Sequence, residues 1–551
     1  MAFLLATPLD ATERRWLSAV IACTLLVISL PYAMAAAITP PGYEYFGLLY
    51  NPDDQNVHLA WARQAAQGHF FFRDLFTTEG LSGSQTPLFT NLFCWLLGVL
   101  SRVLHLPLIW VYHALRLLFT ALALCWFYAL CTHLTADKRI RLIALVLVSL
   151  SAGAGWLQSL LPNLFASRVF MDRPDGQLMM PEAFAFTSAL IFPLNIASLA
   201  LLAFIYAGVL QAQQTGQMRD AFAAGAAALV LTNIHTYDAL PLNATLLVWM
   251  GLSGLKAGDK RVPCLAPLLV IACTLPPLLY QWIVFRNSEE FRIKALTPTL
   301  APPIFDVLLS YGLLFLLAVI GTVALRREPR IRLMIVWATV TLLMIYAPVS
   351  FARKMIEGLH LPLCFLAATG LIWLVSRLQP QLVRGAIIGG VVTLSCVSSI
   401  YFAIWCVGNA ADNNFSRIGV LMPPLYLTQG DAAALRYLAQ AQPGKMNSRA
   451  VLCLRLLGNY VPRETGSTVY MGHWAETLDH ERKLAESYRF YSGRMSQSEA
   501  LAWLRANHIG YVIEGFYERL FAKELHWSLP AQRLPLKKLF DENGTAIYAV
   551  P

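Results

Sequence analysis

The chain has 551 residues, of which 57% are hydrophobic and 13% charged, and its mean hydropathy is +0.54. A soluble globular protein carries about 25% charged residues, so the composition excludes that class and predicts a polytopic membrane protein. The net charge of +10 does not indicate nucleic acid, because Lys and Arg gather in cytoplasmic loops and near lipid head groups of membrane proteins. The ten cysteines form no CxxC pair and no Cys/His cluster with zinc spacing.

The first apolar segment, Trp16 to Ala37, follows the basic pair Arg14-Arg15. The small residues at its end resemble a signal-peptidase site, but the segment is long enough to remain as a signal anchor. We therefore expect Gly42 and the loop that follows to lie on the non-cytoplasmic side of the membrane.

Further apolar segments of near-spanning length follow as far as residue 407. The predicted helices are 16–38, 86–104, 108–133, 139–161, 184–212, 220–235, 237–255, 263–285, 303–325, 331–349, 356–377 and 384–407. The basic loops orient the second half with its C-terminal end outside. The same count of spans places the basic loop Asp137–Arg141 on the outer side, against the positive-inside rule. The count is therefore wrong by one between residues 86 and 161, and the prediction is 11 to 13 spans.

Residues 410–551 contain no long apolar run and predict a small α/β domain outside the membrane. Its predicted elements are helices at 431–441 and 498–507, strands at 449–454, 467–471 and 509–514, and a hairpin over 539–548 with an Asn543-Gly544 turn. The predicted organisation is thus a transmembrane catalytic module, 1–409, with an outside loop at 40–85, followed by an extracytoplasmic domain, 410–551.

An acidic pair, Asp53-Asp54, stands in the first outside loop. Asn51 is a favourable N-cap, Pro suits the first helical position, and acids favour the first turn. One interpretation is therefore only a well-capped amphipathic helix, Pro52 to Gln67, lying on the membrane.

A second acid, Glu79, follows another short amphipathic stretch, Gly68 to Phe76. Carboxylates on two surface helices can converge, so that one accepts a proton from a nucleophile and the other orients the acceptor or a cation. A divalent cation, Mg²⁺ or Mn²⁺, can bind between Asp54 and Glu79, although nothing in the sequence requires a cofactor.

This arrangement of acids resembles the GT-C glycosyltransferases, and in particular looks like that of protein O-mannosyltransferases and lipid A aminoarabinose transferases. The similarity in motif covers about residues 12–135, and the many-span layout extends it over the chain. It implies a mainly α, polytopic fold and a sugar donor linked to a polyprenyl phosphate. The family's first-loop acid corresponds to Asp54 or its neighbour Asp53, and the second acid to Glu79. The Lys-Pro-Pro that often follows the second acid is replaced by Gln85-Thr86-Pro87.

Basic residues in another outside segment can supply a phosphate contact instead. Arg353 and Lys354 lie outside against the positive-inside trend, and a lipid phosphate is a natural partner for them. The alternatives are an anchor to anionic head groups or an ion pair with Glu357.

Three more groups are candidates for substrate binding. His235, Tyr237 and Asp238 lie at an outside turn, where they line a substrate pocket or merely cap a helix hairpin. Glu182 begins a helix from the outside and either faces the cavity or only complements the helix dipole. His473 and Trp474 follow a predicted strand, where Trp can stack on a sugar or pack the domain against the membrane region.

Together with the resemblance, these features predict an integral membrane glycosyltransferase, and the resemblance implies transfer with inversion by a single displacement. Asp54 or Asp53 is the base, Glu79 orients the acceptor, and Arg353 and Lys354 stabilise the departing phosphate. The expected partners are a lipid-linked sugar donor, membrane lipids and an acceptor that is a glycan, a lipid or a protein. The compact loops favour a bacterial inner membrane and a role in the cell envelope. A secondary transporter or flippase and a catalytically inactive relative are the alternatives.

Overall fold

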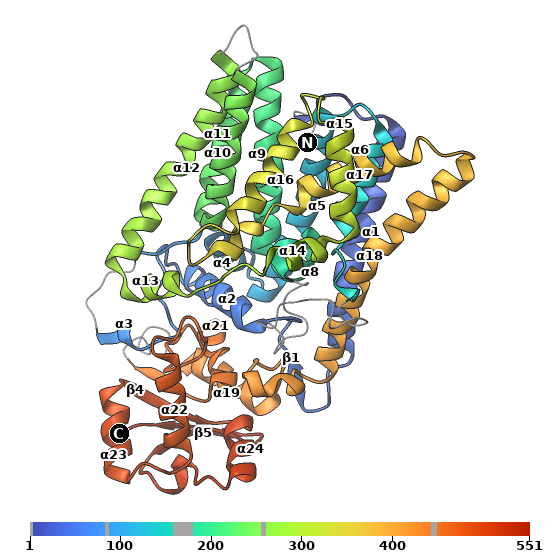
Figure 1. Cartoon of the computed structure of the whole chain (residues 1–551). Helices are drawn as coiled ribbons and strands as arrows, with labels where there is room; N and C mark the ends of the chain where they lie inside the picture. Colours follow the sequence, from blue (N-terminus) through green and yellow to red (C-terminus); the bar gives the residue numbers. More distant parts are fainter. Residues whose placement is uncertain (1–3, 83–87, 158–179, 255–260, 442–448) are drawn as a thin grey trace. The chain divides into compact units, whose positions relative to one another are not determined.

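The computed structural model of the chain describes residues 4–82, 88–157, 180–254, 261–441 and 449–551. It divides into two compact units, whose elements are labelled in Figure 1. Unit 1 comprises Met1–Leu30, His113–Ile283 and Pro298–Trp405, and unit 2 comprises Pro31–Tyr112, Val284–Thr297 and Cys406–Pro551. Unit 2 thus joins the first loop to the C-terminal residues, and the predicted domain boundary at 409/410 stays a prediction.

Unit 1 is helical in all of its described elements. Apolar helices are expected here because a chain in hydrocarbon must satisfy its backbone hydrogen bonds internally. The unit contains, whole or in part, α1 (Ala11–Ala37), α5 (Leu108–Leu134), α6 (Lys138–Leu150), α8 (Ala185–Ile191), α9 (Pro193–Thr215), α10 (Met218–Ile234), α11 (Ala239–Gly254), α12 (Arg261–Asn287), α14 (Ile304–Tyr311), α15 (Leu313–Leu325), α16 (Arg332–Met344), α17 (His360–Val375) and α18 (Gln381–Ala411). Short 3-10 helices are η3 (Pro181–Ala183), η4 (Thr236–Asp238) and η5 (Ala352–Ile356).

Among the described residues, six helical segments are long and apolar enough to cross a membrane. A seventh results if α14 and α15, which are bent by 89° at the break between them, form one broken span. Each predicted apolar segment contains a described helix, although the start of 86–104 and the ends of 139–161 and 237–255 lie outside the described residues. Several of these helices are shorter than a full span, and the total of 11 to 13 spans stays a prediction.

Helices α15 and α17 pack backbone to backbone in unit 1. A Cβ atom on Gly321 would lie 2.1 Å from the Leu366 carbonyl oxygen, and one on Gly370 would lie 2.1 Å from the Leu317 carbonyl oxygen. Small residues permit this close approach, as is common between membrane helices. Most of α17 is consequently buried.

Unit 2 combines helices with two small sheets. Its helices are α2 (Pro52–Ala66), α3 (Glu79–Ser82), α4 (Leu92–Leu104), α13 (Glu289–Leu296), η6 (Phe415–Val420), α19 (Gln429–Ala441), α20 (Arg455–Gly458), α21 (Val461–Thr465), α22 (His480–Tyr491), α23 (Gln497–Ala506), α24 (Phe516–Leu525) and η8 (Pro530–Gln532). Strands β1 (Tyr43–Tyr45) and β2 (Tyr426–Thr428) pair antiparallel. The second sheet contains β3 (Ala450–Leu452), β4 (Ile509–Glu514), β5 (Lys537–Glu542) and β6 (Thr545–Ala549), in the order β3-β4-β6-β5.

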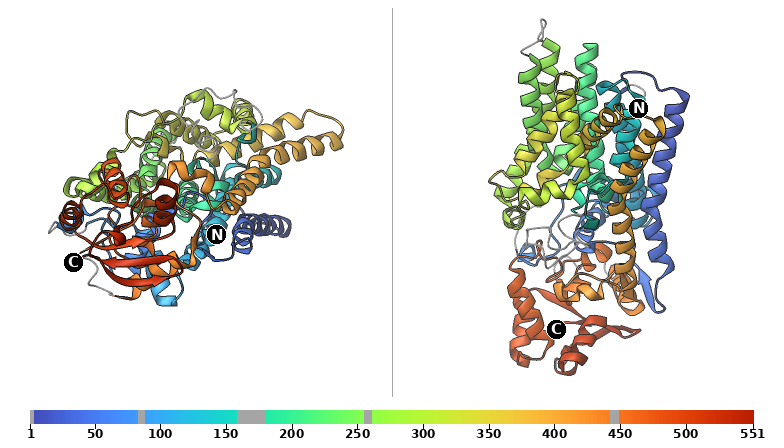
Figure 2. Two further views of the ribbon diagram at one scale, coloured as in Figure 1. Left: turned by 90° about the horizontal axis from the view of Figure 1, so that it is seen from below. Right: turned by 45° about the vertical axis from the view of Figure 1, so that its right-hand side comes forward.

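Most of the predicted C-terminal helices and strands are confirmed. The four-stranded sheet is visible in Figure 2, left. Strands β5 and β6 form the predicted hairpin, and both turn residues have positive φ, 46° at Asn543 and 81° at Gly544. A two-residue type I′ turn requires this geometry, which explains the Asn-Gly pair. The predicted strand 467–471 contributes only an isolated bridge between Val469 and Val451, and helices α22 and α24 were not predicted.

Helix α2 forms as predicted, but it is buried on most of its surface instead of on one face. Eleven of its 15 residues are buried, and it packs against α4 and α21. A Cβ atom on Gly98 of α4 would lie 2.2 Å from the Ala62 carbonyl oxygen of α2, so α2 and α4 touch through their backbones.

Two predictions for the first loop are wrong. Asn51 has φ of 43° and makes no side-chain cap bond, because its amide donates to the Asp54 carboxylate instead. The stretch 68–76 is not helical; its backbone pairs with other segments, as in the bridge between Phe72 and Phe89.

Candidate functional site

The first turn of α2 presents Asp53 to a buried set of donors. Its side chain is 3% exposed, and Arg455 Nη2 lies 2.5 Å from Oδ2. Asn459 Nδ2 donates to Oδ1, also at 2.5 Å. A buried carboxylate is tolerated only when it is paired and hydrogen-bonded, so Asp53 serves as a fixed link between α2 and the α20 segment.

The neighbouring Asp54 differs, because its side chain is 47% exposed. Its Oδ1 lies 3.0 Å from His473 Nε2, and Asn51 donates to its Oδ2 at 2.5 Å. His473 Nδ1 accepts from the backbone N–H groups of Ala475 and Glu476, at 3.1 and 3.2 Å. We infer that the proton of the neutral ring is on Nε2, from which it is donated to Asp54. The arrangement is an accessible carboxylate held by a buried imidazole.

A polar network behind the acidic pair ties α2 to the segment 455–463. Asn56 donates to Asn459 Oδ1 at 2.5 Å, and Arg463 donates to Asn56 Oδ1 at 2.9 Å and to the Phe46 carbonyl oxygen at 2.8 Å. These residues were not among the predicted site residues. The available signal was the spacing of Arg455, Asn459 and Arg463, which recur every four residues as on one helix face.

Glu79 begins α3 and pairs with the C-terminal part of unit 2. Lys483 Nζ of α22 lies 2.7 Å from its carboxylate, and the Thr77 hydroxyl donates to the same oxygen. Burial tends to raise the pKa of Glu79, but the hydrogen bonds from Lys483 and Thr77 outweigh it and lower that pKa. Burial lowers the pKa of Lys483, against the effect of Glu79. The structure therefore supplies a lysine beside the second acid, although none follows it in sequence.

A cavity of about 320 Å³ lies next to Glu79 in unit 2. That volume is at the lower end of small-molecule sites. Polar and aromatic residues line it, among them Gln64, Gln67, His69, Phe71, Arg73, Asp74, Thr77, Glu290, Phe291 and Thr468. This cavity could not be predicted from local sequence patterns, because its described walls come from three distant stretches of the chain.

Trp474, predicted to contact a sugar, is 44% exposed. Its ring stacks on that of His473, with centroids 6.0 Å apart and an interplanar angle of 28°. His473 itself is buried and holds Asp54. An exposed indole beside the accessible carboxylate is suited to stacking on a sugar face, and this role stays a prediction.

The other predicted substrate-binding residues form close pairs within unit 1. Arg353 Nη2 lies 3.8 Å from Glu182 Oε1, and Lys354 Nζ lies 4.8 Å from the centre of the Tyr237 ring. His235 Nδ1 lies 3.0 Å from Asp238 Oδ1 and 3.3 Å from Glu357 Oε2.

The hypothesis of a cation between Asp54 and Glu79 is not tested by this geometry. Each acid has its own basic partner, His473 or Lys483. Within the described part of the chain, the group of at least three residues with metal-like spacing is instead His235, Asp238 and Glu357.

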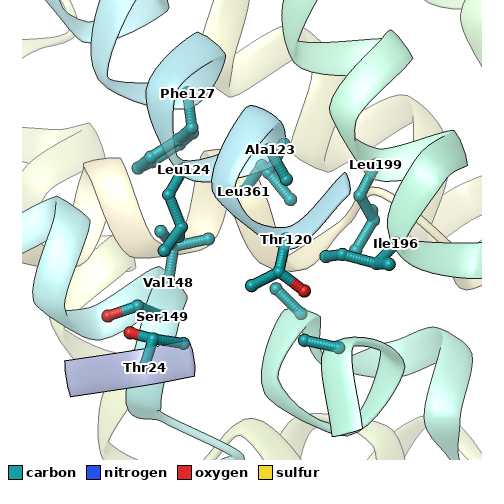
Figure 3. Close-up of a pocket in the computed structure, with 12 residues that line it drawn as sticks. Thr24, Thr120, Ala123, Leu124, Phe127, Val148, Ser149, Ile196, Leu199 and Leu361 are labelled. Atoms are coloured by element: carbon teal, nitrogen blue, oxygen red, sulfur yellow. The ribbon is translucent and has the colours of Figure 1, made fainter. Parts of the chain in front are cut away.

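A further pocket in unit 1 has no such chemistry (Figure 3). It has a volume of about 10 Å³ and apolar walls. The hydroxyls of Thr24, Thr120 and Ser149 each donate to the backbone of their own helix. A space of this size has room for about one water molecule and not for a sugar.

No known family model matches the chain, and no curated protein matches it in sequence. The chain is similar in structure to the archaeal oligosaccharyltransferase AglB of Archaeoglobus fulgidus in complex with an inhibitory peptide and a dolichol-phosphate. The TM-score is 0.53 at 12% identity, over 98% of this chain and 75% of that chain. The apo form of the Archaeoglobus fulgidus enzyme matches with a TM-score of 0.56 at 11% identity, over the same shares. Its complex with Zn and sulfate matches at 0.50 and 12% identity, over 95% of this chain and 73% of that chain.

These similarities confirm the predicted fold class. The chain shares the fold of the archaeal oligosaccharyltransferase over nearly its whole length, in agreement with the predicted mainly α membrane fold, and with its apolar helices it is an integral, multi-pass membrane protein.

Proposed function

We propose that this protein is an integral membrane glycosyltransferase that moves a sugar from a polyprenyl-phosphate donor to an acceptor at the extracytoplasmic face. The observation that carries the proposal is Asp54, an accessible carboxylate held by His473 beside the buried Asp53, on a GT-C fold. The complex of the archaeal enzyme with a dolichol-phosphate supports a lipid-linked donor.

The proposed reaction is a single displacement with inversion. The Asp54 carboxylate takes the proton of an acceptor hydroxyl or amine while that group attacks the anomeric carbon of the sugar. The bond between the anomeric carbon and the phosphate oxygen breaks, and its electron pair leaves with the polyprenyl phosphate. This group leaves without general-acid assistance, so one base is sufficient. His473 keeps the Asp54 carboxylate in one orientation.

The remaining polar residues are proposed to bind substrate. In unit 1, Arg353 and Lys354 neutralise the donor phosphate, and their contacts with Glu182 and Tyr237 hold them in place. In unit 2, Glu79 orients the acceptor.

The domain arrangement and the cellular setting are also part of the proposal. Residues 1–409 form the transmembrane catalytic module, and residues 410–551 form a domain outside a bacterial inner membrane. The acceptor is a glycan, lipid or protein of the cell envelope. A divalent cation is compatible with the proposal, since the archaeal enzyme was solved with Zn and sulfate.

A donor panel tests this function. Purified protein in lipid vesicles receives a series of polyprenyl-phosphate sugars together with a cell-envelope extract as the source of acceptor, and released polyprenyl phosphate is measured. We expect turnover of one donor class. Transbilayer movement of a donor without its cleavage would favour the flippase alternative. Neither cleavage nor movement of any donor would contradict the proposal and favour an inactive relative.

A further inference from the structure

A compact group of ligand-type side chains lies in unit 1, at the ends of helices. His235 lies between α10 and η4, Asp238 ends η4, and Glu357 directly follows η5, three residues before the first residue of α17. One ligand atom from each residue lies within 4.8 Å of the other two. The carboxylate side chains of Asp238 and Glu357 are 1% and 0% exposed, and that of His235 is 13% exposed.

The two carboxylates are electrostatically unsatisfied. Within the part of the chain that the structure describes, none of their four buried oxygens accepts a hydrogen bond, and adjacent buried carboxylates repel each other. One proton on His235 Nδ1, which faces both acids, can serve only one oxygen at a time. The nearby cation Arg353 pairs with Glu182, and Lys354 lies over the Tyr237 ring. A positive charge placed between the three residues would remove this imbalance.

The distances fit a metal ion at that position. Zn²⁺ binds imidazole nitrogen and carboxylate oxygen at about 2.0–2.2 Å, so neighbouring ligand atoms of a tetrahedral site lie about 3.4 Å apart. The observed separations from His235 Nδ1 are 3.0 Å to Asp238 and 3.3 Å to Glu357. The three ligand atoms therefore lie close to the positions that they would occupy around one bound metal ion.

We infer that His235, Asp238 and Glu357 bind one divalent transition-metal ion, for which Zn²⁺ is the best fit. An imidazole among the ligands favours Zn²⁺ over Ca²⁺ and Mg²⁺, which prefer oxygen ligands alone, and the two carboxylates also suit Mn²⁺. Three protein ligands leave a coordination position open for water or substrate. This inference does not depend on the proposed glycosyl transfer, and it places the metal away from Asp54 and Glu79 in the sequence.

Metal binding is measured on the full-length protein in detergent after removal of metal with a chelator and titration with Zn²⁺ and Mn²⁺. The variants are Asp238→Asn and Glu357→Gln. Asp220→Asn is the matched control, because it removes another buried acid at the opposite end of α10. Glu79→Gln tests the alternative site in the first loop.

We expect one bound ion in the wild-type protein and in both Asp220→Asn and Glu79→Gln. Loss of an outer-shell partner weakens metal binding by ~10–100-fold. Loss of a direct ligand, as in Asp238→Asn or Glu357→Gln, should weaken metal binding by at least as much. Cobalt substitution gives a readout independent of activity, since bound Co²⁺ should show visible absorption that disappears in Asp238→Asn.

If a variant fails to fold, the wild-type protein still tests metal binding by itself. Its midpoint of thermal unfolding should rise with Zn²⁺ and fall after chelation. The inference is overturned if the folded wild-type protein binds neither ion, or if Glu79→Gln loses the metal while Asp238→Asn and Glu357→Gln retain it.

Discussion

Replacement of Asp53 by Asn should destabilise unit 2 far more than the same replacement of Asp54. Asn has one acceptor oxygen, so its amide group would face one of the two donors, Arg455 or Asn459, that now contact the carboxylate. Arg455 would remain buried, at 7% side-chain exposure, without a counter-charge. Removing one partner from a buried ion pair costs about 3–5 kcal/mol, and we expect a loss of that order for Asp53→Asn.

The matched change, Asp54→Asn, disturbs a carboxylate that is half exposed. Its hydrogen bonds to His473 and Asn51 have a net value of about 1 kcal/mol, because water can replace them. The two adjacent substitutions should therefore have opposite consequences. Asp53→Asn lowers the free energy of unfolding, whereas Asp54→Asn leaves it nearly unchanged and abolishes transfer.

The assay is denaturant unfolding in detergent, followed by tryptophan fluorescence, for Asp53→Asn, Arg455→Met and the double variant. Residues in one ion pair couple by about 0.5–3 kcal/mol, so the double variant should lose less stability than the sum of the single ones. If Asp53→Asn is as stable as wild type, or if the two losses simply add, the assignment of Asp53 to a structural role is refuted.

Three further predictions concern the surroundings of the acidic pair. Burial raises the pKa of Glu79, but the hydrogen bonds from Lys483 and Thr77 outweigh it, so that the folded-state pKa is lowered. The wild-type protein should therefore be more stable than Glu79→Gln above pH 4.5, and this difference should disappear as the pH falls through the lower folded-state pKa. A stability difference that grows on acidification would contradict this. Gly98→Ala should lower both stability and transfer, since its methyl group has no room against α2. Gly408→Ala is the control, because a Cβ atom there would meet no described atom within 4 Å beyond the backbone of its own helix; it should change the free energy of unfolding by no more than about 1 kcal/mol and leave transfer unchanged. Trp474→Ala should raise the KM about two- to tenfold, from the ~0.5–1.5 kcal/mol of ring stacking, and an unchanged KM would remove Trp474 from the site.

The sequence was sufficient for features that depend on local pattern. The apolar segments predicted helices at the right places, because hydrocarbon leaves a chain few other structures. The Asn543-Gly544 turn was predictable from the positive φ that the hairpin requires.

Features that depend on distant residues could not be predicted. Asp53 meets Arg455 across 402 positions of the sequence, and Glu79 meets Lys483 across 404. Nothing near either acid identifies its partner. The stretch 68–76 has helix-like periodicity, yet its aromatic residues are used in tertiary contacts, such as those of Phe72 and Phe89, and the helix does not form.

The role of Asp54 as base is tested most directly by transfer under single-turnover conditions with the donor that the wild-type enzyme cleaves. Asp541→Asn, which removes an acid exposed on β5, is the matched control. We expect wild-type transfer by Asp541→Asn and loss of transfer by a folded Asp54→Asn protein that still binds the donor. Equal rates of polyprenyl phosphate release by Asp54→Asn and wild type would contradict it.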